Sequence, residues 1–147
     1  MKNLFLSILL FFTVGATKDT FAHCQVPCGI YGDQNRFEQM LEDQSTIEKA
    51  SKLINELSGK KDAQSQNQLS RWVSTKESHA TAIQKTIADY FMAQRIKASD
   101  PKYVEKLTKA HSIMVAAMKC KQSVDAETSA SLKQAILSFH KSYEGKK

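Results

Sequence analysis

The sequence predicts an all-α fold: an antiparallel, up-down four-helix bundle that follows an irregular N-terminal hook. Apolar residues recur at helical spacing in four segments, and no segment shows sustained period-two alternation. Glycine and proline are scarce, with five and two residues in 147, and they fall near breaks between these segments. Four amphipathic helices with short polar connections are typical of a bundle, which we expect over residues 34–147.

The first predicted helix carries an apolar stripe from Phe37 to Leu57. A polar stretch, SGKKDAQSQN at 58–67, is expected to form a loop. The second predicted helix has a stripe nearly thirty residues long, from Leu69 through Ile96.

The third predicted helix follows the break Ser99-Asp100-Pro101, with Pro101 suited to its first turn. Its apolar residues run from Tyr103 to Met118. Another polar break at 121–127 precedes the fourth helix, whose stripe runs from Leu132 to Tyr143.

Residues 1–22 have the features of a cleaved export leader. Met1-Lys2 is a short positive start, Leu4–Val14 is a run of apolar and small residues, and Thr20-Phe21-Ala22 ends on small residues. The run is shorter than the roughly 20 apolar residues that span a bilayer. We expect cleavage after Ala22 and a mature domain at 23–147. A cut after Ala16 and a retained membrane anchor are the alternatives.

The charge of the chain is modestly positive. The whole sequence carries +6, and the mature part carries +5 because the leader holds two lysines and one aspartate. No basic run is interleaved with aromatic residues, so a nucleic-acid partner is not expected. The lysines are spread along the predicted helices as on a solvated surface, and no membrane association is expected after processing.

Three cysteines make a disulfide framework a poor explanation, because three is an odd number for an exported protein. Cys120, at the end of the third predicted helix, fits a packed and unreactive thiol. Cys24 and Cys28 lie close together, which favours a metal site or a redox use. A local disulfide between them is the alternative.

The hook, residues 23–31, concentrates two thiols and an imidazole before the first helix. Pro27 and Gly29 bend the chain so that Cys24 and Cys28 can converge. Cleavage after Ala22 would give His23 a free amine, which forms a chelate ring with the amide nitrogen of Cys24. Two nitrogens and two sulfurs in a plane suit Ni(II) or Cu(II), whereas zinc prefers a tetrahedron.

The segment HCQVPCGIY at 23–31 resembles the start of the nickel superoxide dismutases. The resemblance extends loosely over the helical remainder, including Arg36-Phe37-Glu38 in the first helix and Asp89-Tyr90-Phe91 late in the second. It implies an enzyme that converts superoxide to dioxygen and hydrogen peroxide while nickel cycles between Ni(II) and Ni(III).

The resemblance also implies roles for individual residues. One nickel ion per subunit is bound by the His23 amine, the Cys24 amide nitrogen and the thiolates of Cys24 and Cys28. The His23 imidazole binds axially in the oxidised state. Tyr31 orders water or gates the approach of superoxide, although packing of the hook is an alternative role. Glu38 orients the histidine ring.

The sequence departs from the family at one position. An arginine on the second helix normally completes the contact between the carboxylate and the histidine, and the closest match here is His79. We therefore leave His79 outside the predicted site.

The resemblance further implies a homohexamer and maturation by a signal peptidase or a dedicated peptidase. We expect a periplasmic or secreted location, with a cytoplasmic protein processed by its own peptidase as the alternative. Two other functions compete with the enzyme: an exported metal-delivery protein, and a thiol redox module that uses Cys24 and Cys28.

Overall fold

A computed structural model describes residues 32–144. Within that range the chain is all-helical and contains no strand. Its elements are α2 (Asp33–Leu57), α3 (Ala63–Lys85), η1 (Thr86–Arg95), α4 (Tyr103–Gln122) and α5 (Ala126–Glu144). Because η1 continues α3 without a break, these elements correspond to the four predicted helices.

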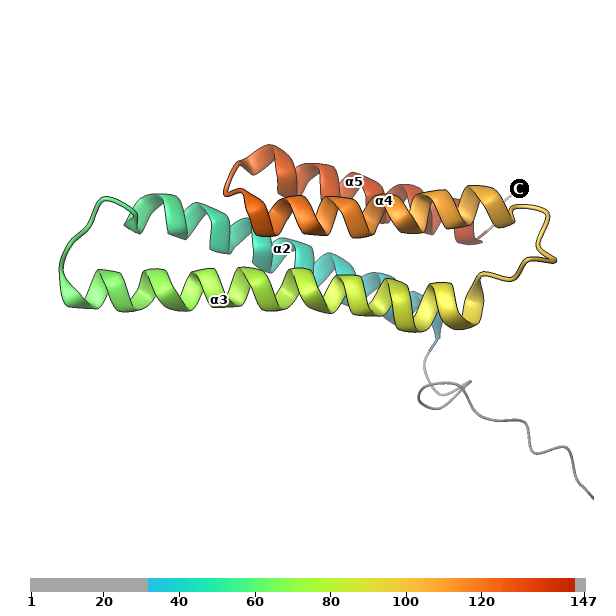
Figure 1. Ribbon diagram of the computed structural model, residues 1–147, viewed down its shortest axis with the longest axis horizontal. Coiled ribbons are helices and arrows are strands. Elements are labelled where there is room, and N and C mark those ends of the chain that lie inside the picture. The colour runs from blue at the N-terminus through green and yellow to red at the C-terminus, as the bar shows by residue number, and fades with distance from the viewer. Residues whose placement is uncertain (1–31, 145–147) are drawn as a thin grey trace, which may run out of the picture.

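The helices lie side by side, as Figure 1 shows. Helix α2 packs against α3 and α5, and α4 packs against the same two neighbours. Each helix therefore covers two others, which is compatible with a helical bundle. At the α2–α3 connection, both of these helices extend beyond the shorter α4–α5 pair (Figure 1).

The buried side chains follow the helical stripes of the sequence. Phe37 is 1% exposed, and the other large apolar side chains that are fully buried are Met40, Ile47, Ile83, Ile87, Phe91, Ile113, Leu132, Ile136 and Phe139. They form one core cluster to which every helix contributes. Polar Gln44 is also buried, and its amide donates to the carbonyl of Ser129 at 3.1 Å, which links α2 to α5.

The predicted loop at 58–67 is too long, because α3 begins at Ala63. The side chain of Asp62 accepts a hydrogen bond from the backbone N–H of Ser65 at 2.9 Å. This contact satisfies one of the free N–H groups at the helix start, and it allows the polar residues that follow to be helical.

The expected role of Pro101 in the first turn of a helix is also wrong. Helix α4 begins two residues later, at Tyr103. The turn before it is organised by Asp100, whose side chain accepts from the Lys102 N–H at 2.8 Å and pairs with Lys106 at 2.6 Å. Pro101 lies inside this turn and before the helix.

The second predicted helix changes its winding near its end. Residues 86–95 form a π-helix, in which the Ile96 N–H donates to the carbonyl of Phe91, five residues earlier, at 2.8 Å. The apolar stripe continues through this change, since Ile87 and Phe91 are both buried. π-Helical turns are rare and are often found at functional sites.

Candidate functional site

Most of the predicted site lies outside the described residues. This applies to His23, Cys24, Cys28 and Tyr31, whose segment joins α2 through Gly32. The described part of the chain therefore shows what surrounds the start of α2.

Glu38 is exposed on α2. The side-chain amide of Gln34 donates to Oε1 of Glu38 at 2.9 Å, so within the described range its hydrogen-bond partner is on its own helix. His79, the closest match to the family's arginine, instead pairs with Asp43, with 2.7 Å between Nδ1 and Oδ1. Asp43 lies five residues beyond Glu38, so the two carboxylates point roughly 140° apart around α2.

A cluster around Asp33 stands at the start of α2. Its carboxylate accepts a hydrogen bond from the hydroxyl of Tyr90 at 2.5 Å and from that of Tyr143 at 2.9 Å. Arg95 donates to both carboxylate oxygens, through Nε at 2.8 Å and Nη2 at 2.6 Å. Asp33, Tyr90, Arg95 and Tyr143, which we call the Asp33 cluster, join α2 to η1 and α5.

The cluster lowers the pKa of its carboxylate and raises the pKa values of its two phenols. Burial alone would raise the pKa of Asp33, but hydrogen bonds from Arg95, Tyr90 and Tyr143 outweigh it and lower the pKa. Burial and the bond to Asp33 raise the pKa of Tyr90, and they raise that of Tyr143 to about 12. At neutral pH the carboxylate is therefore charged, and both phenols keep the protons they donate.

Cations also lie over the two tyrosine rings. The guanidinium of Arg36 is 5.2 Å from the centre of the Tyr90 ring, and that of Arg95 is 5.7 Å from it. The ammonium of Lys106 is 5.1 Å from the centre of the Tyr143 ring. These distances are in the range of cation–π attraction, so each ring is held at its face as well as at its hydroxyl.

A layer of aromatic rings packs next to the Asp33 cluster. The ring of Phe37 lies 4.9 Å from that of Phe91 and 5.5 Å from that of Phe139. It also stacks on the imidazole of His140 at 4.1 Å, and Tyr143 lies 5.3 Å from Phe91. The rings come from α2, η1 and α5, the same three elements that the Asp33 cluster connects.

A pocket of about 340 Å³ opens beside this layer. Its lining combines the first two turns of α2 with the last two turns of α5: Asp33, Gln34, Phe37, His140, Tyr143 and Glu144. Nε2 of His140 lies 3.0 Å from the carboxylate of Glu144. The pocket thus adjoins the point at which the hook joins the bundle.

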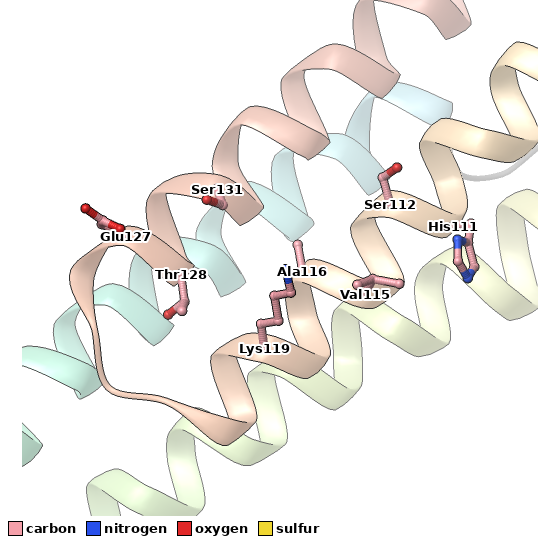
Figure 2. A pocket seen from close by; sticks show the side chains of 8 residues that line it. All are labelled: His111, Ser112, Val115, Ala116, Lys119, Glu127, Thr128 and Ser131. Carbon is pink, nitrogen blue, oxygen red and sulfur yellow. The ribbon is translucent and has the colours of Figure 1, made fainter.

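A second hollow, of about 480 Å³, lies between α4 and α5 (Figure 2). Its lining side chains are mostly small: His111, Ser112, Val115, Ala116, Lys119, Glu127, Thr128 and Ser131. Figure 2 shows the His111 ring and the Glu127 carboxylate at opposite ends of the groove. This separation does not suit a shared catalytic or metal-binding role for the two.

Residues 32–144 contain no group of three or more His, Cys, Asp or Glu side chains that could hold a metal ion. Cys120 is fully buried in the core, where burial raises the pKa of its thiol. Nor is any helix in this range long and apolar enough to cross a membrane.

The described residues form a small helical protein, and the chain carries the donor-rich sequence 23–28 before the first of these helices. A sequence model of the nickel-containing superoxide dismutases matches residues 18–147, and the chain belongs to this family. It is a nickel-dependent superoxide dismutase, an oxidoreductase whose substrate is superoxide. Comparison with curated proteins and with solved structures gave no match.

Sequence reasoning missed two of the four members of the Asp33 cluster. Tyr90 was predicted as part of Asp89-Tyr90-Phe91 and Tyr143 as the end of the fourth apolar stripe, whereas Asp33 and Arg95 had no assigned role. One signal was present: an acidic residue in the first turn of a helix is favoured there by the helix dipole. That signal does not reveal its partners on two other elements.

Proposed function

We propose that the hook holds one nickel ion per subunit and that this ion disproportionates superoxide. The residues that would hold it are His23, through its amine, Cys24, through its amide nitrogen and thiolate, and Cys28, through its thiolate; the His23 imidazole would be a further donor to the oxidised ion. The observation that supports this proposal is the family match, which spans both the hook and the helices.

The donor set fits nickel on chemical grounds. Thiolates and a deprotonated amide are strong anionic donors, and two nitrogens with two sulfurs suit the planar geometry of Ni(II). When bound there, nickel supplies a Ni(II)/Ni(III) couple, through which one superoxide is oxidised to dioxygen and a second, with two protons, is reduced to hydrogen peroxide.

The remaining roles belong to residues near the ligands. We assign to the Tyr31 hydroxyl the ordering of water and of the incoming anion. We assign to Glu38 the orientation of the His23 ring, because a carboxylate that accepts from a ligating histidine fixes its direction. Since Gln34 donates to Oε1 of Glu38, we assign Oε2 to this contact.

Processing and assembly complete the proposal. A signal peptidase or a dedicated peptidase removes residues 1–22, and the mature subunits form a homohexamer. The short connections at 58–62 and 123–125 favour an up-down, antiparallel order of the helices. We propose a periplasmic or secreted location, with a cytoplasmic enzyme as the alternative.

The test is metal analysis combined with superoxide decay on natively processed protein. The intact mass should equal residues 23–147 plus one nickel, and decay of superoxide should be catalysed. A matched control carries one extra residue before His23, which removes the amine from the ligand set while keeping every side chain. That control should lose turnover, and active protein with residues still attached before His23 would contradict the ligand set.

Substitution of His23 separates binding from turnover. His23→Ala, if processed normally, keeps the amine, the amide nitrogen and both thiolates, so it should bind nickel and turn over more slowly. Unchanged turnover would argue against the axial imidazole. Bound nickel with superoxide decay at the uncatalysed rate would indicate a carrier, and activity that survives chelation would indicate a thiol redox module.

A further inference from the structure

We propose that Asp33 is a positioning residue, which fixes the direction in which the nickel-binding hook leaves the bundle. This inference rests on the proposed function of the hook. It concerns the way the helical part of the chain holds that segment, and it adds no ligand to the metal.

Asp33 lies close to the hook in the chain. It is the first residue of α2, and only Gly32 separates it from Tyr31. Gly32 provides no side-chain cap to the helix, and a Cβ added there would meet no atom of residues 32–144 within 4 Å. Residue 32 therefore contributes little packing of its own, so Asp33 is the nearest described residue that can anchor the segment.

The carboxylate of Asp33 makes several contacts, and these come from more than one element. A single hydrogen bond would leave the carboxylate free to pivot, whereas Asp33 accepts four from three residues on two other elements. The Arg95 contact is bidentate, which adds directional specificity to the ionic attraction. The side chain of Asp33 is only 24% exposed, so solvent screens these contacts only in part.

The π-helix η1 carries two of the residues that donate to Asp33. In an α-helix, two residues five positions apart point roughly 140° away from each other. The i→i+5 hydrogen bonding of η1 winds the chain more loosely and brings such residues closer to one face. Tyr90 and Arg95 are five positions apart, and both donate to Asp33. The unusual winding thus places two donors on a single carboxylate.

The two tyrosines of the Asp33 cluster are themselves held in place by a buried ring. Both tyrosine hydroxyls belong to rings in contact with Phe91, which is fully buried. Metal sites require their supporting groups to be held within about 0.5 Å, and loss of an outer contact typically costs about 10–100-fold in metal affinity or activity. The Asp33 cluster supplies such support at the base of the hook.

The experiment compares natively processed wild type, Asp33→Asn and Lys76→Met. Asp33→Asn keeps the size of the side chain and removes its charge. Lys76→Met removes a buried ammonium that contacts the end of α4 and the α4–α5 connection, roughly 25 Å along α5 from the Asp33 cluster. It therefore controls for loss of stability alone. The readouts are nickel affinity by chelator competition, the electron paramagnetic resonance spectrum of the oxidised nickel, and the Tm of the metal-free protein.

We expect Asp33→Asn to weaken nickel affinity by about 10–100-fold and to alter the spectrum. Lys76→Met should lower Tm while leaving affinity and spectrum unchanged. Arg95→Lys, which keeps the charge but loses the bidentate contact, should fall between wild type and Asp33→Asn. If Asp33→Asn does not fold, Tyr143→Phe removes one donor and should change the spectrum in the same direction.

The inference is overturned if Asp33→Asn, or Tyr143→Phe in its place, alters affinity and spectrum no more than Lys76→Met does. That result would leave the nickel enzyme intact. A wild-type protein that binds nickel elsewhere than at residues 23–28, or binds none, would contradict the proposed function itself and the role of Asp33 with it.

Discussion

The Nζ of Lys76 lies 2.8 Å from the carbonyl oxygen of Lys121, across the interface between α3 and α4. It also donates to the carbonyls of Cys120 at 2.5 Å and Ser123 at 3.3 Å. Lys76 is only 3% exposed. The last carbonyls of a helix have no partner within it, so this ammonium supplies three donors at the end of α4.

Replacing Lys76 by methionine should lower the free energy of unfolding by about 1–3 kcal/mol, because buried carbonyls would lose their donor. Urea denaturation measures the change. Lys52→Met is the control, since its side chain is 78% exposed and its ion pair within residues 32–144 is a 4.0 Å contact with Glu56. It should change stability by less than about 0.5 kcal/mol. Equal effects of the two substitutions would contradict a capping role for Lys76.

Phe37→Ala should destabilise the protein by about 3–5 kcal/mol, since it empties the centre of the aromatic layer. Thermal and urea unfolding of the metal-free protein give the measurement. Leu137→Ala serves as the comparison, because Leu137 is 40% exposed and should cost far less. A loss below about 1 kcal/mol at Phe37 would mean that the layer closes around the gap.

The acid stability of the protein should depend on Asp33. Its pKa is lowered in the folded state, so the unfolded state binds the proton more readily and acidification favours unfolding. The stabilisation is fully present above the ordinary pKa of 3.8 and is lost as the pH falls through the lower folded value. Wild type should therefore lose stability more steeply than Asp33→Asn below about pH 4.

Other acidic groups do not obscure this comparison. The pKa values of Asp62, Asp100 and Glu105 are also lowered by hydrogen bonds, but these groups are present in both proteins. Unfolding free energies measured from pH 7 to pH 2.5 should show a gap between the two proteins that narrows on the acid side. A constant gap would show that the charge of Asp33 does not stabilise the fold.

The thiol of Cys120 should be unreactive until the protein unfolds. It is fully buried, and burial raises its pKa, so little thiolate is present to react. A Cys24→Ser, Cys28→Ser double variant isolates this thiol for alkylation followed by mass spectrometry. Labelling should be slow without denaturant and complete in 6 M guanidinium, a concentration of about the order that unfolds even stable domains. Rapid labelling of the folded variant would contradict the packing of α4.

The helices were predictable because burial repeats at the helical period. The stripe from Leu69 to Ile96 marked the second helix correctly but gave no sign of its π-helical end. Ile87 and Phe91 are four residues apart and are buried in either winding, so apolar spacing does not distinguish the two. The start of α3 was missed for a different reason: the cap at Asp62 depends on local hydrogen bonding, which hydrophobic pattern does not report.

The proposed donors of the hook lie within six residues and can be read together in the sequence, and they stay a prediction. The Asp33 cluster assembles from three distant segments, so the sequence did not predict it. The lysines were expected on a solvated surface, and Lys76 is the clear exception. Its burial depends on the end of α4, about 45 residues away along the chain, and no short motif encodes that contact.

The hydrogen bond between Asp33 and Tyr143 joins residues that are 110 positions apart. During synthesis the carboxylate leaves the ribosome long before the phenol that completes its surroundings. The Asp33 cluster is therefore complete only after α5 has been made and has docked. Under the role proposed for Asp33, the support of the nickel-binding segment is then the last part of the fold to be completed, and metal loading would follow the docking of α5.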